Sequence, residues 1–264
     1  MTPIRLGAVE YLNARPLVWG LDRWPARFSL RYDVPAKCAA LLHEDAIDLG
    51  LIPSIEYLQR PDYLAVPGVA VISRGTVASV ALFATRQPRA IRSIAVDSTS
   101  RTSVVLLRVL CAQRFHIDPT FLSMPPDLHA MTARCDAALL IGDLALCADH
   151  ERAGLIKIDL GEEWLAMTGL PFVYAFWAGR AGVVGPQDVS ALQAARDDGM
   201  ANLDRVAMEY FRDDPEKVEI ARRYLRDNVK YVLGDEEVAG LRRFYEAAAG
   251  LGIVPAAPAL RFYS

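Results

Sequence analysis

The sequence lacks any apolar run approaching the roughly 20 residues that a membrane-spanning helix needs. Its first residues, Met1–Leu6, also lack the basic segment followed by a long apolar segment that is typical of a secretion signal. We therefore expect a cytoplasmic protein with no membrane partner. With a net charge of −3 and no basic block interleaved with aromatic residues, we expect no nucleic-acid partner either.

Common metal-ligand and hydrolase motifs are missing as well. The four cysteines form no CxxC pair, and three of them lie in apolar stretches typical of buried, reduced thiols. The four histidines are scattered, with no H-E-x-x-H or similar ligand spacing. No G-x-S-x-G segment, the nucleophile turn of many Ser-His-Asp hydrolases, is present. We therefore expect no metal site and no hydrolase triad.

The chain does contain enough apolar residues for a large core, since 53% of its 264 residues are hydrophobic and 23% are charged. Short apolar runs alternate with segments of helical periodicity, which is typical of an α/β protein. We expect strands at residues 4–9, 28–33, 45–52, 79–85, 91–96, 134–141 and 170–178. We expect helices beginning near residues 35 and 104, and over about 187–211, 215–228 and 235–249.

Two parts of the chain repeat one plan. Residues 45–54 and 136–143 each begin with an aspartate, continue as an apolar run and end at a polar side chain. The repetition predicts two facing α/β lobes with a ligand cleft between them. The apolar stretches 79–85 and 170–178 then serve as crossings between the lobes. We expect lobe one to comprise residues 1–84 and 178–264, and lobe two residues 85–177.

The most informative stretch is Asp97–Ser103, where an expected strand turns directly into a helix. Five of the six residues from Ser98 to Ser103 carry hydroxyl groups, and the sixth is Arg101. Hydroxyls, an arginine and free first-turn N–H groups together make a site for a carboxylate or phosphate. The alternative is that the hydroxyls only cap the helix. We take Thr99, Ser100, Arg101, Thr102 and Ser103 as candidate binding residues.

Polar residues at the ends of other expected strands are further candidates, because open α/β sheets bind ligands at their carboxyl ends. Tyr11 and Asn13 follow the first strand, and Ser54 follows the strand at 45–52. Equally simple interpretations are a core tyrosine, a turn asparagine and an ordinary loop serine.

The second lobe offers Gly142, which would allow a ligand close to the backbone, and Asp143, which either receives a ligand hydroxyl or caps the next helix. Ser79 and Tyr174 lie on the crossing stretches, so we expect them in the floor of the cleft.

As a set, several motifs resemble those of the chorismate dehydratases of the futalosine route to menaquinone. They occur in order along most of the chain: Val9–Asn13 with Arg15–Leu17, Gly50–Tyr57, Asp97–Ser103, Leu140–Asp143, Asp159–Trp164 and Thr168–Ala175. The resemblance implies the fold of a type II periplasmic binding protein whose cleft has become an active site.

The resemblance also implies a lyase without a cofactor, which converts chorismate to 3-[(1-carboxyvinyl)oxy]benzoate and water. We expect one substrate carboxylate on residues 100–103, and the other on Asn13 with Ser54 or Ser79. Because no histidine or lysine lies at an expected strand end, we favour proton removal by the substrate's own enolpyruvyl carboxylate. Asp143 is the alternative base, followed by Glu56, so the catalytic candidates are Asn13, Ser79 and Asp143.

Two other functions remain open at this point. One is a cytoplasmic binding protein or sensor for a small carboxylate, since a fold does not determine a function. The other is the naphthoate-forming lyase of the same pathway, which is expected to use a cleft histidine. Both a monomer and a homodimer are compatible with the sequence.

Overall fold

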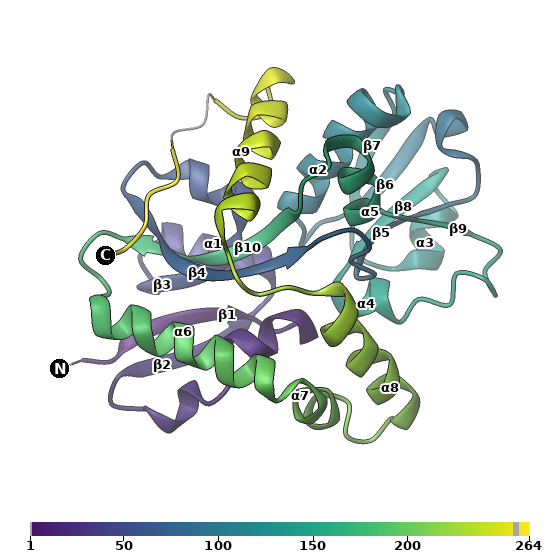
Figure 1. The fold of residues 1–264 in the computed structure, drawn as a ribbon. Helices are drawn as coiled ribbons and strands as arrows, with labels where there is room; N and C mark the ends of the chain where they lie inside the picture. The colour runs from purple at the N-terminus through teal and green to yellow at the C-terminus, as the bar shows by residue number, and fades with distance from the viewer. Residues whose placement is uncertain (1, 256–258) are drawn as a thin grey trace.

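Two five-stranded sheets, each covered by helices, form two lobes that lie side by side in the computed structural model (Figure 1). The structure describes residues 2–255 and 259–264. The first sheet consists of β1 (Ile4–Val9), β2 (Phe28–Asp33), β3 (Leu49–Pro53), β4 (Tyr63–Ser73) and β10 (Phe172–Arg180). The second consists of β5 (Val80–Ala84), β6 (Ser93–Asp97), β7 (Thr120–Met124), β8 (Ala137–Ile141) and β9 (Ile156–Asp159).

The two sheets have the same topology. Their orders are β2-β1-β3-β10-β4 and β7-β6-β8-β5-β9. In each, the first three strands are parallel, and the fourth is antiparallel to both of its neighbours. The expected two-lobed α/β architecture with one repeated plan is therefore confirmed.

Each lobe contributes helices to the outer faces of its sheet. The α-helices are α1 (Pro35–His43), α2 (Thr102–Leu110), α3 (Leu128–Thr132), α4 (Gly142–Leu146), α5 (Leu160–Thr168), α6 (Pro186–Ala201), α7 (Leu203–Tyr210), α8 (Pro215–Arg223) and α9 (Asp235–Gly250). Short 3-10 helices at Leu12–Val18 and Ser54–Gln59 follow β1 and β3, and π turns at Cys111–Phe115 and Tyr224–Asn228 extend α2 and α8.

Local sequence accounts for several of these boundaries. Pro35 stands in the first turn of α1, where its missing N–H costs nothing. The Asp159 carboxylate caps α5 by accepting from the amides of Gly161 and Glu162. The expected helix at 187–211 is instead divided into α6 and α7 at Asn202, whose φ of −122° is not helical. The strand expected at 45–52 begins only at Leu49, because Asp45 forms a left-handed turn with φ of 60°.

The crossings between the lobes lie earlier in the chain than the sequence predicted. Strand β5 belongs to the second sheet and β10 to the first along their whole lengths. The connecting segments are therefore residues 74–79 and 169–171 rather than the strands themselves. Figure 1 shows β4 and β10 running side by side toward the second lobe.

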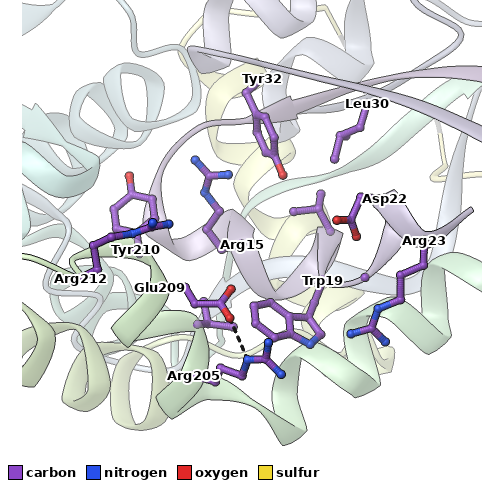
Figure 2. A pocket seen from close by; sticks show the side chains of 13 residues that line it. Arg15, Trp19, Asp22, Arg23, Leu30, Tyr32, Arg205, Glu209, Tyr210 and Arg212 are labelled. Carbon is purple, nitrogen blue, oxygen red and sulfur yellow. Dashed lines mark hydrogen bonds and ion pairs between the residues drawn. The ribbon is translucent and has the colours of Figure 1, made fainter. Parts of the chain in front are cut away.

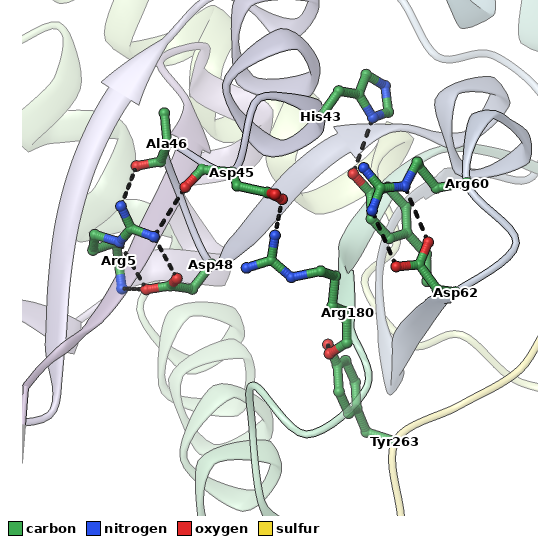
Figure 3. Close-up of polar contacts among 10 residues, drawn as sticks. Arg5, His43, Asp45, Ala46, Asp48, Arg60, Asp62, Arg180 and Tyr263 are labelled. Carbon is green, nitrogen blue, oxygen red and sulfur yellow. Dashed lines mark hydrogen bonds and ion pairs between the residues drawn. The ribbon is translucent and has the colours of Figure 1, made fainter.

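One large apolar cluster runs through the first lobe into the second, and a smaller one fills the far face of the second sheet. Polar contacts close the outer edge of the first lobe, where Arg5 binds Asp48 and Arg180 pairs with Asp45 (Figure 3). No helix in the described part of the chain has both the length and the apolar character needed to cross a membrane.

Candidate active site

A small cavity of about 60 Å³ lies between the lobes, at the carboxyl ends of β1, β3, β6 and β8. Eight of the residues expected at a site line it: Tyr11, Asn13, Ser100, Arg101, Thr102, Ser103, Gly142 and Tyr174. The rest of the lining is apolar, and Arg101 is the one charged residue among the described residues that line it. Ser54, Ser79, Thr99 and Asp143 do not line the cavity but make contacts beside it.

The start of α2 forms the hydroxyl-rich wall of the cavity. No side chain caps this helix, which goes against the interpretation that its hydroxyls serve only as caps. The first-turn amides and the hydroxyls of Ser100 and Ser103 can therefore hydrogen-bond an anion. Asp97, which the sequence reasoning did not select, holds the neighbouring loop, because its Oδ1 accepts from both the amide and the hydroxyl of Thr99 at 2.8 and 2.7 Å. Burial raises the pKa of Asp97, while these two hydrogen bonds oppose the shift.

Ser54 and Thr102 join the lobes. The Ser54 hydroxyl is fully buried and donates to the Val173 carbonyl at 2.8 Å, and it lies 3.4 Å from the Thr102 hydroxyl. The Thr102 hydroxyl also accepts from the Ile55 amide at 3.3 Å. These contacts place the 3-10 helix at Ser54–Gln59 directly against the start of α2.

Tyr11 and Gly142 form a second contact between the lobes. Gly142 has φ of +63°, and a Cβ at this position would lie 2.7 Å from Cδ2 of the Tyr11 ring. The glycine therefore admits a protein side chain where the sequence suggested a ligand. The Tyr11 hydroxyl lies 3.5 Å from that of Thr99, and burial raises the pKa of Tyr11 to about 12.

Behind the cavity wall, three polar groups from distant parts of the chain meet. The Tyr224 hydroxyl lies 2.6 Å from the Ser79 hydroxyl, with the Asn13 side chain beside it. Burial raises the pKa of Tyr224, and both partners oppose that shift. Ser79 is 1% exposed, so Asn13 is the member of this cluster that reaches the cavity. The sequence reasoning missed Tyr224, because no local pattern marks it; only the structure shows that it begins a π turn, a feature frequent at functional sites.

Asp143, the alternative base, has both carboxylate oxygens engaged with the first lobe. Oδ1 accepts from the Leu12 amide at 3.2 Å, and Oδ2 accepts from the Tyr210 hydroxyl. Burial raises the pKa of Asp143, and these hydrogen bonds together with the charge of Arg15 oppose the shift. The geometry gives Asp143 the position of a clasp between the lobes.

Glu56, the less favoured base, lies in a second chain of contacts. Its Oε2 is 3.0 Å from Nε2 of His43, whose Nδ1 is 3.0 Å from the Tyr63 hydroxyl. Its Oε1 is 3.6 Å from Nε of Arg101 in the other lobe. Glu56 therefore orients the arginine of the cavity.

Tyr174 lies on β10 with its hydroxyl 3.2 Å from that of Ser73. Burial raises the pKa of Tyr174 far above its usual range, so this residue is a neutral hydroxyl in the cavity wall. Cys38, Cys111 and Cys135 are buried free thiols, and Cys147 is partly exposed. Over residues 2–255 and 259–264, no cluster of three His, Cys, Asp or Glu side chains is suited to hold a metal ion.

Sequence comparison finds relatives along almost the whole chain. A family described as menaquinone biosynthesis matches residues 4–250. A chorismate dehydratase of Thermus thermophilus is 33% identical over 272 residues, covering 97% of this chain and 98% of the relative.

Solved structures similar to this fold include protein AF1704 from Archaeoglobus fulgidus, with a TM-score of 0.77 and 19% identity over 96% of this chain and 99% of that one. The periplasmic aliphatic sulphonate binding protein SsuA from Escherichia coli has a TM-score of 0.71 and 18% identity, covering 100% of this chain and 92% of that one. These similarities confirm the expected periplasmic-binding-protein fold.

Proposed function

The chain belongs to the menaquinone biosynthesis family, and from that premise we propose that it is a chorismate dehydratase, releasing water and 3-[(1-carboxyvinyl)oxy]benzoate. The observation that carries the proposal is the combination of this relationship with an anion-binding wall, the start of α2, in the cleft. We further infer that the reaction serves the futalosine route and takes place in the cytoplasm.

The substrate has two carboxylates, and the cavity offers groups for each. We assign one carboxylate to the first-turn amides of α2, the hydroxyls of Ser100 and Ser103, and Arg101. Asn13 takes the other polar end of the substrate, near the bond to be broken. Ser79 acts on the substrate through Tyr224, which fixes the Asn13 amide.

The reaction removes a ring proton and the ring hydroxyl, forms a ring double bond and so makes the ring aromatic. Aromatisation supplies much of the driving force, so the protein's task is orientation and charge placement. The substrate's enolpyruvyl carboxylate is the proposed base, because neither oxygen of Asp143 is free of the inter-lobe contacts and Glu56 is held by His43 and Arg101. The departing hydroxyl, with the Asn13 amide beside it, takes up the proton that the carboxylate removed, so water leaves and the carboxylate is regenerated.

Substrate entry requires the lobes to separate. Sites for small molecules are commonly about 300–1,000 Å³, whereas the cavity between the lobes is about 60 Å³. The contacts that must break include the polar ones of Asp143, Thr102 and Glu56 and the packing of the Tyr11 ring against Gly142. Water is excluded when they form again around the substrate.

The rival functions make different demands. The naphthoate-forming lyase is expected to need a cleft histidine, and the described residues that line the cavity include none. A sensor for a small carboxylate would bind chorismate and leave it unchanged.

One assay separates these possibilities. Purified protein is incubated with chorismate and no added cofactor, and the products are followed by absorbance and mass. An aromatic enol ether, 18 mass units lighter than chorismate because one water (~18 Da) is lost, supports the proposal, with orientation and charge placement as its means. Binding without turnover would support the sensor.

A further inference from the structure

A second cavity, of about 930 Å³, lies on the first lobe outside the cleft (Figure 2). It is bordered by the turns at Leu12–Val18 and Leu21–Arg23, by β2 and by α7. It shares no lining residue with the cavity between the lobes. Its volume lies in the range of about 300–1,000 Å³ that is typical of small-molecule sites, and the proposed reaction does not use it. We call it the arginine groove.

The arginine groove is positive although the chain as a whole is negative. Its lining includes four arginines, Arg15, Arg23, Arg205 and Arg212, and two acidic residues. Of the two acids, Glu209 forms an ion pair with Arg205, with 2.8 Å between Oε1 and Nε. Among the described residues, no ion pair is formed by the other three arginines. Three uncompensated cations facing one free carboxylate favour an anionic ligand.

Arg15 is arranged to receive such a ligand. Its guanidinium carbon lies 4.2 Å from the centre of the Tyr32 ring and 5.1 Å from that of Tyr210. Figure 2 shows the guanidinium between these two rings. Its Nε is buried and has no hydrogen-bond partner among the described residues. Contact with two rings fixes the guanidinium, and its terminal NH₂ groups form no hydrogen bond with the described residues, which leaves them for a carboxylate.

Aromatic surface completes the groove. Tyr32 is 41% exposed, and Trp19 lies in the lining with the Arg205 guanidinium 5.5 Å from its ring centre. Planar faces beside cations suit a planar ligand that carries negative charge.

We propose that the arginine groove binds a small aromatic dicarboxylate, with one carboxylate on Arg15 and the ring against the exposed aromatic faces. The second carboxylate meets the charge of Arg212, while Arg23 lies at the opposite end of the groove (Figure 2). The groove also borders the contact between the lobes, because the hydroxyl of Tyr210 donates to Asp143. The groove does not depend on the reaction in the cleft, so its test uses a probe that is not a substrate.

The probe is benzene-1,3-dicarboxylate, measured by isothermal titration calorimetry. Because the cleft also attracts carboxylates, every titration uses the Ser103→Asp background, which places a negative charge in the cleft wall and leaves the groove unchanged. We expect one probe molecule per chain. Raising the salt from about 0.01 to about 0.15 M, which shortens the Debye length from about 30 to about 8 Å, weakens the binding. The neutral benzene-1,3-dicarboxamide does not bind.

Adding Arg15→Gln removes the central charge and should weaken binding roughly tenfold or more, as expected for a charge-assisted pair. The matched control is Arg31→Gln, an exposed arginine on β2, the strand that carries Tyr32, which does not line the groove and should have no effect. Arg212→Gln is the second test variant if Arg15→Gln does not fold. Absence of binding in the Ser103→Asp background, or equal affinity with and without the Arg15 or Arg212 substitution, overturns the proposal.

Discussion

Replacing Asp143 with asparagine separates a catalytic base from a clasp between the lobes. In the closed structure the carboxylate accepts from the Leu12 amide and the Tyr210 hydroxyl. Asparagine can still accept from the amide, and Tyr210 can turn its hydroxyl to accept from the new NH₂ group while donating to the Glu10 carbonyl, 3.1 Å away. The variant therefore keeps the geometry and loses only the charge.

The magnitude follows from the hydrogen bonds. A hydrogen bond to a charged group contributes about 1.5–3 kcal/mol and a neutral one about 0.5–1.5 kcal/mol. The difference, about 1 kcal/mol, corresponds to about fivefold in the closing of the lobes. Burial makes the charge itself costly, as the raised pKa of Asp143 indicates, and this offsets part of the loss. We therefore expect Asp143→Asn to raise KM by at most about fivefold and to change kcat by less than about tenfold, since losing a general base costs about 10²–10⁴-fold. Steady-state kinetics of chorismate consumption measure both.

Asp143→Ala is the matched comparison, because it leaves the Leu12 amide without a partner at a cost of about 1–3 kcal/mol. Its KM should exceed that of Asp143→Asn. A thousandfold fall in kcat for Asp143→Asn, with KM unchanged, would refute the clasp and the substrate-assisted mechanism together.

The same variant has a pH signature. Burial raises the pKa of Asp143 above that of the unfolded chain, so the folded protein binds this proton more tightly. Its ionisation therefore lowers stability as pH rises from the ordinary aspartate value, about 3.9, through the raised value. Asp143→Asn removes this dependence. In urea titrations, the stability of the variant relative to the parent protein should therefore increase from pH 4 to pH 7.

Three further substitutions test other parts of the reasoning. Tyr224→Phe should lower kcat about tenfold or more with little change in KM. The substitution removes the hydroxyl that positions Asn13 and Ser79, but it removes no contact with the substrate. An unchanged kcat would contradict that role. Gly142→Ala places a Cβ against the Tyr11 ring at a positive φ, so thermal unfolding should show loss of stability of about 1 kcal/mol or more and KM should rise; a neutral result would be contrary to the packing. The Arg5 guanidinium lowers the pKa of Asp48, so the pair stabilises above about pH 4 and loses that effect as pH falls through the lowered value. Arg5→Gln should cost up to about 1 kcal/mol more at pH 7 than near pH 2, where only the bonds of Arg5 to the Ala46 and Asp45 carbonyls remain to be lost. An equal cost at both values would count against the pair.

The sequence predicted the strands correctly where a short apolar or alternating pattern was not interrupted. Ile4–Val9 and Phe28–Asp33 were predicted with the bounds that the structure has. Strand β4 was missed because Pro67 and Gly68 interrupt its apolar run; the sheet tolerates them because β4 is its edge strand. A pattern read along one strand does not reveal its place in a sheet.

The candidate site was predictable where its residues adjoin in sequence. The run at Asp97–Ser103 carries the composition of an anion site in one segment, and its last four residues line the cavity. By contrast, Asn13, Ser79 and Tyr224 come together only through packing of three separate segments, and Tyr224 follows Ser79 by 145 residues in the chain. No local spacing encodes such a meeting.

The polar contacts between the lobes explain why so many predicted binding residues turned out to touch protein. Thr102, Asp143 and Gly142 each meet a partner from the first lobe. A residue at a strand's carboxyl end in this fold faces either a ligand or the opposite lobe, and both require short polar side chains or glycine. We expect closure around a substrate to use both the residues that contact the ligand and the residues that contact the opposite lobe. Binding of the substrate carboxylates favours the closed state, and the direct contacts between the lobes stabilise that state further. Variants of the inter-lobe residues should therefore act mainly on KM, and variants of Asn13 mainly on kcat.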